Sequence, residues 1–142
     1  SIFSFKTGKR IVEMVHEDLT PSKIMTKKAF ENAIYVASAI GASSNCPPHL
    51  TAIARHMGID FGIDNWEKLG HDIPLLVNCQ PAGEHLMEGF FKAGGIPAIM
   101  QELMKNNKLH KDLMTVTGKT IAENLIEKID LDENIIKSFK PL

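Results

Sequence analysis

A turn of three polar residues, Ser43, Ser44 and Asn45, could do chemistry at the start of a predicted helix. It lies in the stretch GASSNCPPHLTAIARHMG, residues 41–58, where two prolines and an apolar pattern at helical spacing follow it. Ser44 or Asn45 can cap this helix by accepting a hydrogen bond from an amide of its first turn. The alternative is that free amides at the helix N-terminus hold an anion such as a carboxylate or phosphate.

The two cysteines, Cys46 and Cys79, do not form a metal-binding motif. They are too few and too far apart for a zinc or iron-sulfur site of their own, so we expect small buried hydrophobic residues. The six histidines are scattered. His49 and His56 share one side of the predicted helix, but two turns separate them, which is too far for a shared metal. We expect this segment alone to bind no metal.

A Gly-Lys-Thr sequence at residues 118–120 is similar to the end of a phosphate-binding loop. The first glycine of that motif would fall at position 113, which is leucine. No serine lies in the context of a nucleophile elbow either. The residues alone therefore indicate no nucleotide site and no nucleophile.

The charge and composition of the chain exclude some classes of binding partner. The 142 residues are 44% hydrophobic and 23% charged, which fits one globular domain. A net charge of -1 gives no electrostatic case for nucleic acid or an anionic membrane. No apolar run approaches the length that spans a bilayer. We expect a cytoplasmic protein, or one in an organelle lumen, without nucleic-acid or membrane partners.

Two helices are predicted before the polar turn. Residues 8–18 form a short amphipathic pattern, and residues 20–40 form a longer one that is apolar on most sides. The residues of the first helix that we expect to point inward are Ile11, Val12 and Val15. The second helix ends directly before the polar turn at residues 41–45.

Strand-like runs alternate with these helices and predict an α/β fold. Residues 74–79, PLLVNC, are typical of a strand buried on both faces, and residues 113–117 are interpreted as a second short strand. Two or three strands make a poor sheet alone. We therefore expect a helix-rich segment of a larger α/β domain with two or three short strands. Its ends, residues 1–8 and 130–142, are expected to be loosely packed.

Four long stretches in the same order resemble one enzyme family. They are EDLTPSKIMTKKAFENAI, GASSNCPPHLTAIARHMGI, IPLLVNCQPAGEHLMEGFFKAGGIPAIMQEL and LMTVTGKTIAEN. From about Lys9 to Glu127 the chain resembles an internal part of the dihydroxy-acid and sugar-acid dehydratases, which include phosphogluconate dehydratase. The stretch NWEKLGHDIPLLVNCQPAGEHL is more similar to the sugar-acid (pentonate) enzymes than to the branched-chain enzyme. The family's usual Gly-Gly-Ser-Thr-Asn occurs here as GASSN, residues 41–45.

The resemblance implies a hydro-lyase that removes water from a 2,3-dihydroxy acid, such as a pentonate, to give a 2-keto-3-deoxy acid. In such enzymes an iron-sulfur cluster acts on the departing 3-hydroxyl, and Mg²⁺ holds the carboxylate end of the substrate. A serine alkoxide takes the proton from C2. The family's cluster cysteines and magnesium carboxylates lie upstream of the residues present here, and its catalytic serine lies in the domain that follows. The resemblance also implies a homo-oligomer, dimeric or tetrameric, for the parent enzyme.

The resemblance thus makes residues 1–142 part of the N-terminal α/β domain of a larger dehydratase, without catalytic or metal-ligating residues of its own. Cys46 and Cys79 fall where relatives usually carry apolar residues, so cluster ligation is not assigned to them. The substrate-binding candidates are Ser43, Ser44 and Asn45, and the isolated chain is expected to be inactive. Two alternatives stay open: a non-catalytic scaffold, and a small-anion-binding module that uses the N-terminus of the central helix.

Overall fold

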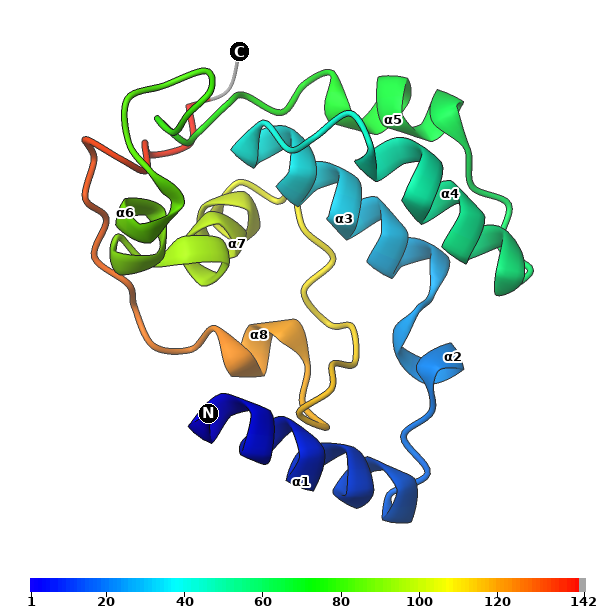
Figure 1. Cartoon of the computed structure of the whole chain (residues 1–142). Coiled ribbons are helices and arrows are strands. Elements are labelled where there is room, and N and C mark those ends of the chain that lie inside the picture. The colour runs from blue at the N-terminus through cyan, green and yellow to red at the C-terminus, as the bar shows by residue number, and fades with distance from the viewer. Residues whose placement is uncertain (141–142) are drawn as a thin grey trace.

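The helices predicted around the polar turn are present and belong to a larger helical set (Figure 1). The computed structural model describes residues 1–140, and eight helices lie in that range. They are α1 (Ile2–His16), α2 (Pro21–Ile24), α3 (Lys27–Ile40), α4 (Cys46–His56), α5 (Ile63–Gly70), α6 (Met87–Lys92), α7 (Gly95–Lys105) and α8 (Ile121–Asn124). None of these eight is both long and apolar enough to cross a membrane.

Thr26 divides the helix that was predicted over residues 20–40. Its side-chain oxygen accepts a hydrogen bond from the Ala29 N–H at 3.3 Å and starts α3. Thr20 and Pro21 occupy the first positions of the separate short helix α2. One continuous helix over 20–40 is therefore wrong, because a threonine that caps a new helix competes with continuation of the previous one.

Helices α3, α4 and α5 pack against one another around a small aromatic core (Figure 1). The ring centroids of Phe30 and Phe61 lie 5.3 Å apart. Ile34 and Ala54 are completely buried beside them. Burial of each large apolar side chain stabilises the fold by roughly 1.5–3 kcal/mol. This core fixes the direction in which α3 delivers the chain to residues 41–45.

A second, larger core joins the C-terminal part of α3 to α7 and to two irregular segments, residues 73–79 and 135–139. Its fully buried large side chains come from α7 and from both segments: Leu76, Ile99, Leu103 and Ile136. Segments distant in the sequence thus share one interior. The extended backbone of residues 73–79 is held by this shared burial.

The predicted α/β fold is wrong for residues 1–140, because they contain no sheet. Residues 74–79 are extended and largely buried, but no strand lies beside them. The Leu76 N–H donates to the carbonyl of Ala39 at the end of α3, at 2.7 Å. Val77 and Ile136 form only an isolated bridge. A continuous apolar run shows that a segment is buried, but not whether helices or strands cover it.

The second predicted strand, residues 113–117, forms one side of a tight turn. The Thr115 N–H donates to the Lys119 carbonyl at 3.0 Å, and Gly118 between them has a φ of +78°. The chain reverses within these few residues. This reversal leaves no room for a strand of ordinary length.

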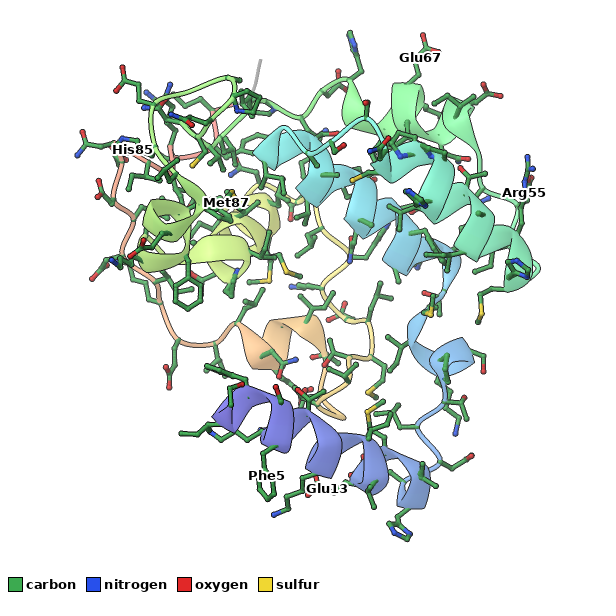
Figure 2. All side chains as sticks on the ribbon, viewed as in Figure 1. Phe5, Glu13, Arg55, Glu67, His85 and Met87 are labelled. Carbon is green, nitrogen blue, oxygen red and sulfur yellow. The ribbon has the colours of Figure 1, made fainter. Side chains whose placement is uncertain are left out.

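Helix α1 begins at Ile2 rather than at the predicted Gly8, and its apolar side chains face solvent. Phe5 projects from α1 away from the other helices (Figure 2). The three residues predicted to point inward are all more than half exposed: Ile11, Val12 and Val15. Met14 is the buried residue of this helix. The predicted inward face of α1 is therefore wrong.

Part of the C-terminal end belongs to the larger core, although a loosely packed end was predicted over residues 130–142. The buried residues are Ile135, Ile136 and Phe139. The Asp132 carbonyl accepts hydrogen bonds from the amides of Ile135 and Ile136 at 2.9 and 2.8 Å. Residues 141–142 lie outside the described part of the chain.

Candidate functional site

The chain reverses direction at Gly41, between α3 and α4. Gly41 has a left-handed φ of +62°, and the Ala42 N–H donates to the Ala37 carbonyl at 2.9 Å. A Cβ atom at position 41 would lie 3.0 Å from Cδ1 of Leu75. Both the backbone conformation and this close approach favour glycine. The turn therefore sets the next residues beside the segment that contains Leu75.

Ser43 organises the start of α4, in place of the predicted Ser44 or Asn45. Its Oγ accepts a hydrogen bond from the Asn45 N–H at 3.2 Å, and its carbonyl accepts one from the Cys46 N–H at 2.9 Å. Asn45 occupies the N-cap position without a side-chain capping bond. The predicted cap by Ser44 or Asn45 is therefore wrong. The Ser44 hydroxyl has no hydrogen-bond partner within residues 1–140.

The first turn of α4 lacks the free amides that an anion site needs. Pro47 and Pro48 carry no N–H. The Cys46 N–H donates to Ser43, and the His49 N–H donates to the Asn45 carbonyl at 3.3 Å. Because these positions either lack an N–H or already donate it, they argue against an anion held by the N-terminus of the central helix.

The polar turn forms one wall of a cavity of about 530 Å³. Residues 41–44 line this wall, so the cavity includes Ser43 and Ser44 but not Asn45. Residues 77, 79, 80 and 81 line the opposite wall, and α6 contributes Met87 and Phe90. The structure thus brings two of the three predicted binding residues to a shared cavity.

The polar groups of this cavity can orient a ligand but offer no strong acid or base. They are the hydroxyls of Ser43 and Ser44, the thiol of Cys79 and the amide of Gln80. Among residues 1–140, no Asp, Glu, Lys, Arg or His lines the cavity. Hydroxyls and amides both donate and accept hydrogen bonds. These groups can therefore hydrogen-bond to a small ligand, although apolar residues such as Val77 and Phe90 line much of the cavity. Proton transfer would need a group from elsewhere.

The sequence did not predict that the loop forming the opposite wall belongs to the site. The His85 N–H donates to the Asn78 carbonyl at 3.1 Å, and the Gln80 N–H donates to the His85 carbonyl at 2.9 Å. The peptide between Gln80 and Pro81 is cis, and a Cβ at Gly83 would collide with Asn78. Asn, Pro and Gly at close spacing do signal a tight loop. Only the packing shows that this loop faces the polar turn.

Neither cysteine belongs to a metal site formed by the described residues. Cys46 is half-buried at the start of α4. Cys79 is buried, with its Sγ 3.9 Å from the Leu86 carbonyl oxygen. No group of three or more His, Cys, Asp or Glu side chains in residues 1–140 could hold a metal ion. The residues present therefore do not fit an iron-sulfur cluster or Mg²⁺.

A cluster of titratable groups lies elsewhere on α3 and does not line the cavity. Nε2 of His110 lies 2.6 Å from Oε2 of Glu31, and burial together with the Glu31 charge raises the pKa of Tyr35. The Asn32 side chain donates to the His110 carbonyl at 2.9 Å and accepts from its N–H at 2.8 Å. This cluster joins α3 to the loop that follows α7.

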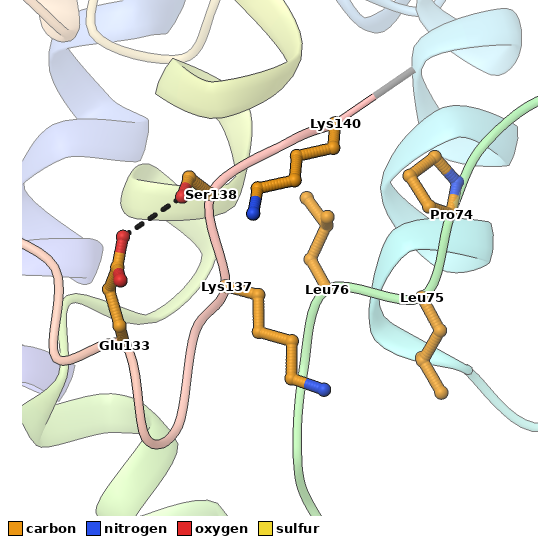
Figure 3. Close-up of a pocket in the computed structure, with 7 residues that line it drawn as sticks. All are labelled: Pro74, Leu75, Leu76, Glu133, Lys137, Ser138 and Lys140. Atoms are coloured by element: carbon orange, nitrogen blue, oxygen red, sulfur yellow. Dashed lines mark hydrogen bonds between the residues drawn. The ribbon is translucent and has the colours of Figure 1, made fainter. Parts of the chain in front are cut away.

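A smaller pocket of about 260 Å³ lies between residues 74–76 and 133–140 (Figure 3). The Ser138 hydroxyl donates to Glu133 at 2.9 Å, and the pocket's two lysines, Lys137 and Lys140, are exposed. None of the predicted binding residues lines it. The cavity beside Ser43 and Ser44 is therefore the candidate functional site.

Comparison with known proteins gives a consistent set of relatives. Residues 3–124 match the family described as dihydroxy-acid/6-phosphogluconate dehydratase N-terminal. D-xylonate dehydratase of Caulobacter vibrioides is 48% identical over 133 residues, which cover 94% of this chain and 22% of that protein. L-arabinonate dehydratase of Rhizobium leguminosarum bv. trifolii is 48% identical over 130 residues, 92% of this chain and 22% of that protein. Dihydroxy-acid dehydratase of Acetivibrio thermocellus is 46% identical over 133 residues, 94% of this chain and 24% of that protein.

The chain spans less than a quarter of the length of these curated relatives. The family match nevertheless includes most of the chain and both walls of the cavity. It also includes the stretches on which the predicted resemblance depends. The chain therefore belongs to the dihydroxy-acid/6-phosphogluconate dehydratase family, whose members named here are hydro-lyases.

Proposed function

We propose that this chain is a segment of a hydro-lyase that converts a 2,3-dihydroxy acid, specifically a sugar acid such as a pentonate, into a 2-keto-3-deoxy acid. In this reaction the C2 proton and the C3 hydroxyl leave as water, and the resulting enol becomes the keto acid. Two relatives at 48% identity are named for pentonates, D-xylonate and L-arabinonate. A relative at 46% is named dihydroxy-acid dehydratase, so identity alone does not separate the substrate classes.

The observation that carries this proposal is the cavity between the polar turn and the loop with Gln80. Ser43, Ser44 and Gln80 present hydrogen-bonding groups to one space of about 530 Å³. A sugar acid carries several hydroxyls and a carboxylate, which such groups can bind. We assign substrate contact to Ser43 and Ser44. Asn45, which does not line the cavity, retains an indirect role at the start of α4.

The cavity walls in residues 1–140 carry no acid or base for the proton transfer. We propose that the base, and the iron-sulfur cluster and Mg²⁺ expected for the family, belong to the remainder of a longer polypeptide. The described residues do not form a site for either metal centre, so no step is assigned through them. On this proposal the isolated chain is inactive. We also propose that the enzyme formed by the longer polypeptide is cytoplasmic and homo-oligomeric.

The test is an assay of the longer polypeptide that carries these 142 residues. D-xylonate, L-arabinonate and a branched-chain 2,3-dihydroxy acid are supplied in turn, and the 2-keto product is measured. We expect turnover of at least one pentonate, with the highest kcat/KM among the three acids. If no dihydroxy acid were dehydrated, the enzyme proposal would be overturned. If the branched acid were strongly preferred, the sugar-acid assignment would be lost.

The role of the turn is tested by Ser44→Ala in the same polypeptide. Loss of one hydrogen bond to substrate removes about 0.5–1.5 kcal/mol of binding, so we expect KM to rise roughly 2- to 10-fold with a smaller change in kcat. Ser22→Ala is the matched control, because Ser22 is exposed on α2 and does not line the cavity. Equal effects of the two variants would argue against substrate contact by Ser44.

The two alternatives predict different results. A non-catalytic scaffold predicts no turnover by any polypeptide that contains the chain. A small-anion-binding module predicts stabilisation by phosphate or acetate without turnover. The anion alternative is the weaker of the two, because the first turn of α4 has prolines or hydrogen-bonded amides at the positions that would bind the anion.

A further inference from the structure

The apolar side of α1 faces solvent, and its charged side faces the rest of the molecule. Its charged side is turned inward, where Nε of Arg10 donates to the Val116 carbonyl at 2.7 Å. The same guanidinium donates to both carboxylate oxygens of Glu17, at 2.7 and 2.8 Å. Met14 is the buried residue of the helix. Apolar residues lie on the other side, and Phe5 and Val15 are 75% and 74% exposed.

These apolar residues, with two small ones, form a stripe that we call the outer face of α1: Ser4, Phe5, Gly8, Ile11, Val12 and Val15. Ile11 lies at the edge of this stripe, where it also lines a pocket with Arg10, Met14 and Val116. Positions 4, 8, 11 and 15 recur at the spacing of one side of a helix. The stripe runs over residues 4–15 of α1, so it is roughly 17 Å long. A Cβ added at Gly8 would meet no atom within 4 Å, so the middle of the stripe is open.

The outer face has the form of a helix-packing surface. Exposed branched apolar side chains at positions 11, 12 and 15 lie on the same helix as Gly8, which has no side chain and open space around it. Helices pack by placing the ridges of one into the grooves of the other. In Figure 2, Phe5 lies on the side of α1 that faces away from the rest of the chain. No helix in residues 1–140 covers this face.

We propose that the outer face of α1 is the docking surface for an apolar helix in the part of the polypeptide outside residues 1–142. This inference rests on the proposed function only in taking the chain as a segment of a longer polypeptide. The lengths of the relatives support it, because the aligned region is only 22% of the Caulobacter protein and 24% of the Acetivibrio protein. Most of each relative therefore lies outside the matched region. Contiguous exposed apolar surface is typical of an interaction site.

A second copy of the chain is the competing occupant. The internal contacts of α1 are mostly polar, through Arg10, and it buries one residue. Few apolar contacts therefore attach α1 to the rest of residues 1–140. A partner in the same polypeptide is present at every protein concentration, whereas a second copy is lost on dilution. This difference supplies a test, and the unmatched length of the relatives favours the same polypeptide.

The test compares thiol labelling at one position in two polypeptides. Val12→Cys is placed on the outer face in the 142-residue chain and in the longer polypeptide, and labelling of residue 12 is followed by peptide mass spectrometry. Lys9→Cys is the matched control, since Lys9 is exposed on the same helix, lies outside the stripe and takes no part in the ion pairs of Arg10. We expect residue 12 to label at least about 100-fold more slowly in the longer polypeptide, because labelling there requires opening of the packed helix. Residue 9 should change far less.

Two results would overturn the proposal. Equal labelling of residue 12 in both polypeptides would show that the face stays in solvent. Protection that disappears on dilution, together with cross-linking between the introduced thiols of two Val12→Cys chains, would show that a second copy covers it. Neither readout depends on dehydration, so protection without activity would remove the proposed function and leave this inference standing.

Val12→Asp gives an independent measurement. In the longer polypeptide it should lower the Tm by several degrees, because it buries a charge in an apolar contact. In the 142-residue chain it should leave the helical content unchanged, since residue 12 is already exposed. A Tm of the longer polypeptide that is insensitive to this change would contradict the proposed contact.

Discussion

Helices α1 and α3 are almost equal in length and both are amphipathic, yet α3 buries several apolar residues and α1 buries only Met14. α3 buries residues such as Phe30 and Ile34 against α4 and α5, whereas α1 turns Arg10 toward the chain and leaves Val15 outside. The cause lies in their neighbours, because α3 contributes to both cores and α1 meets mainly the turn near residue 116. An amphipathic pattern therefore identifies the apolar side of a helix. The structure shows which segment covers that side only when the covering segment belongs to the same chain.

The largest expected difference between the two helices is the effect of truncating an apolar side chain. Ile34 is completely buried, so Ile34→Ala should lower the free energy of unfolding by about 2–5 kcal/mol through lost burial and a new cavity. Val15→Ala on α1 should change it by less than about 0.5 kcal/mol, because Val15 is exposed. Urea unfolding of the 142-residue chain measures both. Similar losses for the two variants would show that α1 is packed in solution.

The next largest effect is expected from the polar anchor of α3. Asn32 is buried and holds both the N–H and the carbonyl of His110. Asn32→Ala should destabilise the chain by about 1–3 kcal/mol, because it removes the partners of both backbone groups. Asn32→Asp keeps the acceptor for the N–H but places a buried carboxylate against the His110 carbonyl, so near pH 7 it should lower the Tm at least as much as Asn32→Ala. An Asn32→Ala variant with an unchanged Tm would contradict this account.

Substitution of glycine by alanine should have opposite signs in the two helices. Gly41 ends α3 with φ +62° and approaches Leu75, so Gly41→Ala should cost about 1–2 kcal/mol. Gly8 lies inside α1 with open space around it, and Gly8→Ala should stabilise the helix by roughly 0.5–1 kcal/mol. Circular dichroism during unfolding measures both changes. Loss of stability in both variants would mean that the space around Gly8 is occupied.

The smallest effect is a local pH dependence of α1. The hydrogen bond from Arg10 holds the pKa of the Glu17 carboxyl below its usual range. Because the folded pKa is lowered, its contribution is present above the unfolded pKa and is lost as pH falls through the folded value. Hydrogen exchange should therefore show α1 loosening below about pH 4, before α3 does. Arg10→Gln should remove this difference, and an unchanged pH profile in that variant would assign the effect to another group.

The candidate site was only partly predictable. The turn with Ser43 and Ser44 was recognised from its small polar residues, and both residues line the cavity, while their contact with substrate stays a prediction. The capping bond was assigned to the wrong residue, because Ser43, Ser44 and Asn45 are all chemically able to make it. The opposite wall with Gln80 was missed, since no local pattern states which surface a tight loop will face.

Helices were predicted more successfully than strands, and the two strand errors have different causes. Residues 74–79 have the composition of a buried strand, but Leu76 pairs with the end of α3 and its neighbours are helices and an irregular segment. Residues 113–117 carry a short apolar pattern that is cut by the turn at Gly118. In both segments the residues favour extended backbone, which does not require a sheet.

The sequence by itself determined the family, the presence of the main helices and the glycine that ends α3. These features depend on residue order, on hydrogen bonds within one turn and on the backbone freedom of Gly41, all of which act over a few residues. The tertiary structure alone decided that residues 73–79 and 135–139 share a core, that the loop with Gln80 faces Ser43, and that the apolar side of α1 points outward. Each of these depends on burial between segments far apart in the chain, and the apolar side of a helix does not specify which distant segment will cover it.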